Sequence, residues 1–262
     1  MVGECRAAPD QISPAYNHWH PLEATWFETA MTKRVAIVQS NYIPWKGYFD
    51  LINGVDEFIL FDDMQYTRRD WRNRNLIKTP AGTRWLTIPV EVKGKFHQLV
   101  HETRVSDPEW ARRHWSSIVQ NYARAPYFRN LAPRIEGIYG AASKEPSLSR
   151  INRLFIDAIC DVLGIGSRIS WSMDYELLDS KTKRLVGLCR SAGATRYLSG
   201  PSARHYIEPR IFEEAGIALE YADYEGYPEY PQLWGAFEHR VTVLDLIFNA
   251  GPAAPRYMKS FG

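Results

Sequence analysis

Cysteine is scarce in this sequence, and its scarcity limits the covalent chemistry to expect. Only Cys5, Cys160 and Cys189 occur among 262 residues, and none of them forms a Cys-x-x-Cys pair. Such a set predicts neither a disulfide framework nor a structural zinc site, and it favours a reducing compartment. Cys160 and Cys189 fall on apolar stripes of expected helices, so we interpret both as buried, unreactive thiols.

Long hydrophobic runs and a strong charge of one sign are also missing. No stretch approaches the roughly 20 apolar residues of a membrane span. The first thirty residues lack the basic and apolar regions of a signal peptide, so we expect a cytoplasmic protein. The 32 Lys and Arg nearly balance the 30 Asp and Glu. This balance provides no general attraction for nucleic acid, and we expect no nucleic-acid partner.

The sequence divides into an N-terminal extension and one predicted domain. Residues 1–32 show no sustained periodicity, and Met31 stands directly before the first clear strand. His18 and His20 in this extension could chelate a metal, but we prefer an irregular segment without one. Residues 33–262 are expected to form a single α/β domain, a size that is ample for one large core.

Apolar runs and helical stripes alternate after residue 32. Residues 35–38 form a short apolar run, residues 46–53 a helix stopped by Gly54, and residues 58–61 a second apolar run. Strand, helix and strand in this order predict a parallel pair. We therefore expect a layered α/β fold with a mainly parallel central sheet flanked by helices. Further helices are expected at 108–122, 147–163, 181–192, 209–215 and 241–249, and further strands at 85–90, 169–172, 197–198 and 217–221.

Polar residues gather just after the first two predicted strands. Ligands of open α/β sheets bind beyond the carboxyl ends of the strands, so these residues predict a binding site. The start of the helix near Gly47 would add backbone N–H donors for an anion. The candidates are Gln39, Asn41, Tyr42, Trp45 and Tyr48 after the first strand, and Asp62, Asp63, Gln65 and Tyr66 after the second.

An arginine-rich segment follows. Arg72 and Arg74, with Asn73 and Asn75, could hold a phosphate or carboxylate, and Trp71 could stack on a base or sugar. The alternative is a solvated loop whose arginines pair with nearby aspartates. Both interpretations remain open from the sequence.

Two histidines and one aspartate are candidates for catalysis, and one turn is a candidate for phosphate binding. His97 is our first choice for a general base because the proton affinity of an imidazole suits proton transfer near the working pH, and His205 is our second choice. Asp63 is a second candidate to accept a proton. Ser199 and Gly200 begin a tight turn that could cradle a phosphate. His97 and His101 lie four residues apart, but Gly94 argues against the helix that would make them metal ligands, so we expect no metal.

The segment Gln39–Phe49 resembles the WbqC-like family, whose members carry a Q-x-N-Y-x-P-W-x-G-Y-F block. Here Ser40 replaces the common proline of the family, and Thr242 replaces a common serine. The resemblance covers the chain from about Lys33 onward. It continues through Asp62–Tyr66, Arg72–Lys78, Trp85–Val90, Tyr197–Gly200, Tyr230–Gln232 and Asp245–Gly251.

This resemblance implies a pathway context and no assigned reaction. Genes of this family are similar to those in bacterial clusters for O-antigen and other surface polysaccharides. A looser likeness links the start of the domain to nucleotidyltransferases, in which a His-x-Gly-His pair opens the first helix. Here Trp45 and Tyr48 stand at roughly the two histidine positions, which weakens the case for adenylyl transfer.

Three functional hypotheses follow. The first is an enzyme that transfers an acyl or aminoacyl group to a nucleotide-linked amino sugar, a small-molecule substrate. The second is nucleotidyl transfer or ATP-dependent ligation on the same scaffold. The third is a non-catalytic partner in glycan assembly whose Trp and Tyr side chains form an interface. The residues identify no cofactor.

Overall fold

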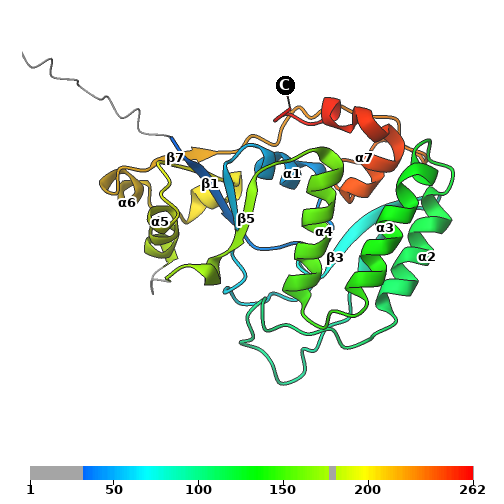
Figure 1. The fold of residues 1–262 in the computed structure, drawn as a ribbon, viewed down its shortest axis with the longest axis horizontal. Coiled ribbons are helices and arrows are strands. Elements are labelled where there is room, and N and C mark those ends of the chain that lie inside the picture. The colour runs from blue at the N-terminus through cyan, green and yellow to red at the C-terminus, as the bar shows by residue number, and fades with distance from the viewer. Residues whose placement is uncertain (1–31, 177–180, 262) are drawn as a thin grey trace, which may run out of the picture. The chain divides into compact units, whose positions relative to one another are not determined.

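The computed structural model describes residues 32–176 and 181–261 (Figure 1). The chain divides into two units, Met1–Met31 and Thr32–Gly262, and the fold below concerns the second. Residues 1–31 of the predicted extension, with His18 and His20, lie outside the described residues.

The centre of the fold is a parallel sheet of five strands in the order β5-β2-β1-β6-β7. β1 and β2 are parallel neighbours, with Val35 opposite Glu57 and Val38 opposite Leu60. This confirms the predicted α/β class and the parallel pair at its start. The strands are β1 (Arg34–Val38), β2 (Glu57–Leu60), β5 (Arg168–Trp171), β6 (Arg196–Ser199) and β7 (Ala218–Tyr221).

Both faces of the sheet are buried because side chains alternate along each strand. On one face Ala36 and Phe58 pack against the larger helical layer, and on the other Val35 and Ile59 pack against the smaller one. Figure 1 shows α5 and α6 to one side of the sheet and the other helices on the opposite side. The helices are α1 (Lys46–Asn53), α2 (Trp110–Tyr122), α3 (Phe128–Ala142), α4 (Leu148–Leu163), α5 (Lys181–Ser191), α6 (Pro209–Glu214) and α7 (Val243–Ala250).

The order of the strands reverses beside β1. The chain runs outward from β1 to β2 and β5, and then returns to the other side of β1 for β6 and β7. The larger helical layer packs on one face, and the helices α5 and α6 that connect β5, β6 and β7 pack on the other. The carboxyl ends of β1 and β6 therefore form the topological switch point, where open α/β sheets bind their ligands.

Two parts of the fold differ from the sequence-based expectation. We predicted a strand over residues 85–90 and none over residues 74–79, but β3 (Arg74–Thr79) and β4 (Gly82–Thr87) form a separate antiparallel hairpin. Helix α3 was not predicted at all. It contains Pro133, which masks a helix in the sequence, although Ile135 and Tyr139 are spaced to pack on one face.

The described residues also include three short 3-10 helices, η1 (Ser172–Asp174), η2 (Pro201–His205) and η3 (Gly251–Tyr257). Across residues 32–176 and 181–261, no helix combines the length and the hydropathy needed to cross a bilayer.

Candidate functional site

The loop that follows β1, residues 39–45, is held at many points by its neighbours. Ser40 N donates to Asp62 Oδ1 at 2.8 Å, and Tyr42 N donates to the carbonyl of Trp71 at 3.0 Å. Asn75 Nδ2 donates to the carbonyls of Tyr42 and Ile43 at 3.1 and 2.7 Å. The segments after β1 and β2 and the strand β3 are thus joined into one framework at the carboxyl edge.

This framework stores backbone strain. Ile43 has a φ of +40°, which a β-branched residue rarely adopts. Such a conformation costs about 1–3 kcal/mol and persists only where its surroundings impose it. The Asn75 amide on one side and the bond from Val243 N to the Pro44 carbonyl, 2.9 Å, on the other hold this turn.

Asn41 and Arg72 meet beside the switch point. Arg72 Nη1 donates to Asn41 Oδ1, and Arg72 Nη2 lies 3.6 Å from Asp70 Oδ2. Arg72 is partly exposed, with 15% of its side chain accessible. The contact brings a guanidinium group from the arginine-rich segment to the end of β1.

Arg74 also lies close to Asp70, but its guanidinium group packs on the ring of Trp85. Burial raises the pKa of the Asp70 carboxyl, yet the charges of Arg72 and Arg74, with bonds from Thr67 and Trp71, bring it below its ordinary value. The Arg74 guanidinium stacks 4.0 Å above the Trp85 ring. Two arginines therefore share one internal anion, which agrees with the alternative interpretation of this segment as self-paired.

Trp45 closes the start of α1. A β-carbon on Gly47 would lie 2.3 Å from Trp45 Cζ2, so the indole packs directly on the first turn of the helix. The indole also makes edge contacts with the rings of Tyr224 and Tyr227, at centroid distances of 5.2 and 5.5 Å. The expected anion site at this helix start is therefore covered by an aromatic ring on the side of Gly47.

We expect Gly47→Ala to destabilise the protein by about 1–3 kcal/mol, because the added methyl group must displace the packed indole of Trp45. Urea denaturation measures the effect. Gly137→Ala is the control, because Gly137 lies in α3 with open space around its β-position. That change should stabilise by about 0.5–1 kcal/mol. Equal effects of the two changes would contradict the proposed packing.

Tyr48 holds the first residue of the loop. Its hydroxyl donates to the Gln39 carbonyl at 3.0 Å, and burial raises its pKa well above the ordinary value. Tyr48 is therefore a neutral donor that positions Gln39. The side chain of Gln39 itself is half-buried at the end of β1.

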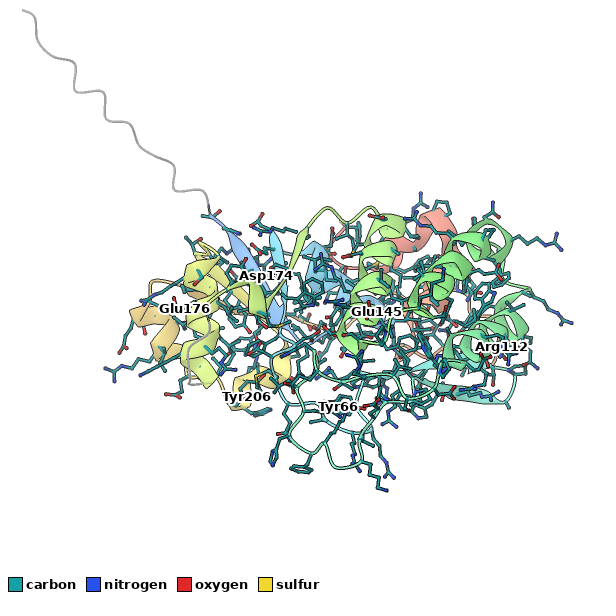
Figure 2. All side chains as sticks on the ribbon, turned by 60° about the horizontal axis from the view of Figure 1, so that its bottom comes forward. Tyr66, Arg112, Glu145, Asp174, Glu176 and Tyr206 are labelled. Carbon is teal, nitrogen blue, oxygen red and sulfur yellow. The ribbon has the colours of Figure 1, made fainter. Side chains whose placement is uncertain are left out.

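The end of β6 forms the other wall of the switch point. Ser199 is buried, and its carbonyl accepts from Ala222 N at 2.8 Å. A β-carbon on Gly200 would lie 4.0 Å from the Tyr224 hydroxyl, so this position has room for contact with a ligand. Figure 2 turns this edge of the sheet forward, with Tyr206 after β6 and Tyr66 after β2 along it.

Arg204, Tyr206 and Tyr224 are the residues that sequence reasoning missed here. The Arg204 guanidinium lies 4.3 Å above the Tyr221 ring, and Tyr206 is 65% exposed. Arg204 and Tyr206 follow the Ser199–Gly200 turn by a few residues, and a basic and aromatic cluster after a strand is the signal that could have found them.

Asp62 and Asp63 have different surroundings. Asp62 is fully buried and accepts from Ser40 N and Ser149 Oγ; burial raises the pKa of its carboxyl, although these bonds oppose the shift. Asp63 accepts from Ser172 Oγ and from Arg184 Nη1, the latter at 2.8 Å. Both oxygens of the predicted catalytic Asp63 thus already bind protein donors, at the ends of β2 and β5 rather than at the switch point.

His97 lies on the loop of residues 91–102, above the end of β2. Gln65 Nε2 donates to the Phe96 carbonyl at 2.9 Å, and Tyr66 N donates to the Gln98 carbonyl at 2.9 Å. His97 is exposed and lines a surface hollow of about 530 Å³. The structure therefore joins Gln65 and His97 in a second group, one strand away from Asn41 and Arg72.

Tyr42, Asn73 and Asn75 face the interior. The Tyr42 hydroxyl lies 2.9 Å from His114 Nδ1 and 2.7 Å from the Tyr139 hydroxyl. Asn73 Nδ2 donates to the Ile88 carbonyl at 2.8 Å. These three predicted binding residues have structural partners, and they support the loop that carries Asn41 and Trp45.

Within residues 32–176 and 181–261, no group of three His, Cys, Asp or Glu side chains is placed to hold a metal ion.

Comparisons with known proteins agree with the residue pattern. The WbqC-like protein family matches residues 39–257, which include the strained loop, the hairpin and the end of β6. "Uncharacterized protein Rv1507c" of Mycobacterium tuberculosis (strain ATCC 25618 / H37Rv) is 54% identical over 227 residues, which cover 87% of this chain and 98% of the relative. No solved structure matches this chain. The match over most of the sequence shows that this chain belongs to the WbqC-like protein family.

Proposed function

We propose that this chain is an enzyme that binds a nucleotide-linked amino sugar at the carboxyl edge of its parallel sheet and transfers an acyl or aminoacyl group to the sugar amine. The observation that carries this proposal is the contact of Asn41 with Arg72 beside the β1/β6 switch point. Open α/β sheets bind nucleotides at this position, and a guanidinium group supplies the charge that a diphosphate needs.

The arginines have donors to offer such a ligand. Within the part of the chain that the structure describes, the buried Nε atoms of Arg72 and Arg74 have no hydrogen-bond partner. An unpaired buried donor costs about 1–3 kcal/mol. A diphosphate that replaces Asp70 as the shared anion would reorient both guanidinium groups and satisfy these donors. In this proposal Gln39 and Asn41 bind the sugar hydroxyls, and Gly200 leaves room for the backbone to approach the ligand.

The chemical step requires a base. The sugar amine attacks the acyl carbon of the donor, a C–N bond forms, and the bond from that carbon to the leaving group breaks. The amine loses a proton, and His97 accepts it in our proposal, which requires a ligand that extends from the Asn41–Arg72 contact to the loop above β2, where the imidazole is exposed. Asp63 is the weaker candidate, since Ser172 and Arg184 already occupy its oxygens. General base catalysis contributes about a hundredfold to ten-thousandfold in rate.

A panel of nucleotide sugars tested by thermal shift examines the binding part of the proposal. We expect at least one to raise the melting temperature by about 5 °C at a hundredfold excess over its Kd. Arg72→Gln should weaken that binding by about tenfold to a hundredfold, because a charge-assisted contact to phosphate is lost.

Arg129→Gln is the matched control, because Arg129 is an exposed arginine in α3. It should leave binding unchanged. The melting temperature of each variant without ligand separates loss of binding from loss of folding. Absence of a saturable shift with every nucleotide sugar, or equal effects of the two substitutions, would exclude the proposed site.

Nucleotidyl transfer is the second candidate. It is favoured by the order of elements at the start of the domain, where β1 leads through Pro44 and Gly47 into α1 and a parallel β2. Calorimetry with an ATP analogue and magnesium distinguishes it, because this candidate requires tight ATP binding in the absence of a sugar. A non-catalytic role in glycan assembly requires that His97→Ala and Asp63→Ala both retain the biological activity of the chain.

A further inference from the structure

An unusually exposed phenylalanine stands on the loop above β2. Phe96 is 74% exposed, although a phenylalanine is normally buried. Lys93 and Lys95 precede it and are exposed, and Gly94 between them has a φ of +74° that turns the chain. An apolar ring that follows these lysines on an exposed loop can enter an apolar phase while Lys93 faces anionic groups. Lys95 forms an ion pair with Glu91.

Two exposed tryptophans lie close to this loop. Trp71 is 38% and Trp85 40% exposed, and their ring centroids are 5.2 Å apart. Arg68, three residues before Trp71, contacts the loop, because its Nη2 donates to the Val92 carbonyl at 2.9 Å. The Phe96 carbonyl in turn accepts from Gln65 at 2.9 Å. These two bonds place the segment that leads to Trp71 against the loop that carries Phe96.

Positive charge is concentrated in the same part of the chain. Residues 67–96 contain eight Lys and Arg against two Asp and Glu, a net charge of +6, whereas the whole chain has +2. The remaining residues are therefore net negative, at −4. Lys78 is buried, and Arg72 and Arg74 are partly buried. The exposed cations of this segment are Arg68, Arg69, Arg84, Lys93 and Lys95.

We propose that this region docks on an anionic membrane surface, with Phe96 inserted among the lipid chains and the tryptophans at the level of the headgroups. We call it the docking surface, formed by Arg68, Trp71, Arg84, Trp85, Lys93 and Phe96. Tryptophans prefer the membrane interface, and Lys and Arg are attracted to anionic headgroups.

The packing of the tryptophans argues against a nucleic acid as the occupant. Stacking of bases requires free aromatic faces. Here the rings of Trp71 and Trp85 contact each other, and the Arg74 guanidinium covers Trp85 at 4.0 Å. Phe96 offers no hydrogen bond to a base. Insertion into a bilayer does not require a free aromatic face for stacking, and the lipid chains can surround the exposed Phe96 side chain.

Docking would also orient the protein. Val100 N donates to the Met64 carbonyl at 2.9 Å, so the loop that carries Phe96 rests on the segment after β2, at the carboxyl edge of the sheet. A bound membrane would then lie beside that edge, where an acceptor anchored in lipid could be reached. This consequence depends on the proposed function, whereas the docking itself does not.

Sedimentation of the full chain with lipid vesicles tests the proposal. We expect binding to vesicles of phosphatidylcholine mixed with phosphatidylglycerol, little binding to phosphatidylcholine alone, and release by added salt. Phe96→Ser should weaken binding about tenfold, because an apolar side chain no longer enters the bilayer. Lys93→Glu should also weaken it, by tenfold or more, since a cation is replaced by an anion.

Matched controls use similar residues elsewhere on the surface. Leu154 in α4 is 38% exposed, and Arg210 in α6 is an exposed arginine. Leu154→Ser and Arg210→Ala should leave vesicle binding unchanged. Absence of binding to the anionic vesicles would overturn the proposal, and so would equal losses in the control and test variants. It would also be overturned if a single-stranded oligonucleotide bound through Phe96 and Lys93 while vesicles did not bind. Nucleotide-sugar binding by the Phe96 variant, measured separately, shows that the ligand site is intact.

Discussion

Replacing Asn75 with alanine will lower the free energy of unfolding by about 2–4 kcal/mol, one of the two largest effects that we expect. The Asn75 amide donates to the carbonyls of Tyr42 and Ile43, and all three residues are buried. Without this amide, two buried carbonyls lose their partner. Ile43 is also held at a φ of +40°, so the strain at this position loses part of its support.

Urea denaturation at neutral pH measures this loss. Asn130→Ala is a suitable control, because Asn130 is exposed in α3 and its replacement should change the free energy by less than about 0.5 kcal/mol. We also expect the Asn75 variant to bind nucleotide sugars weakly, since the displaced turn carries Asn41. A fully stable Asn75→Ala protein would show that the loop does not depend on this amide.

Acidification should produce the second large effect, through His114. This histidine is buried, and burial is the main reason that its pKa is lowered from 6.5 to about 4. The hydrogen bond to the Thr87 carbonyl raises the pKa, and the charge of Arg113 lowers it. Its Nε2 lies 3.1 Å from the Thr87 carbonyl, so this nitrogen carries the proton. Nδ1 therefore accepts from the Tyr42 hydroxyl at 2.9 Å.

The direction of the pH effect follows from the lowered pKa. Above pH 6.5 the imidazole is neutral in both the folded and the unfolded chain, and stability is complete. Between pH 6.5 and about 4, the unfolded chain binds a proton that the folded protein excludes, so stability falls as the pH falls. The shift corresponds to about 3 kcal/mol.

Unfolding free energies from pH 7 to about pH 4 test this prediction in the original protein and in His114→Gln. The glutamine amide can still donate to Thr87 and accept from Tyr42, but it does not titrate. The difference between the two proteins isolates the histidine, because the carboxyl groups titrate in both. Parallel pH profiles for the two proteins would show that His114 does not control acid stability.

Much of the parallel core could be predicted because its signals are local. The apolar run at residues 35–38, the helix stopped by Gly54 and the run at residues 58–61 require only neighbours in sequence. The helix at 148–163 has a single apolar stripe and Gly164 at its end in the left-handed conformation, as a helix stop predicts. The hairpin was missed because β3 begins with two polar residues, Arg74 and Asn75, and its pairing with β4 involves a turn at Gly82.

The candidate site could be predicted as a set of residues and not as a geometry. Asn41 and Arg72 are 31 positions apart, and their contact required the strand order, the loop of residues 39–45 and the start of β3 together. The different hydrogen-bond partners of Asp62 and Asp63 could not be predicted either, because Ser149, Ser172 and Arg184 are distant in the sequence. Arg204 and Tyr206 became candidates only when β6 was found beside β1.

The pattern of residues along the chain thus determined the family, the α/β class and the polar residues that follow each strand. Tertiary structure alone decided which of these residues meet, which are buried as supports and which remain exposed. The physical reason is that periodicity reports the burial of a residue within its own element, whereas a site is made by contacts between elements whose order the periodicity does not specify.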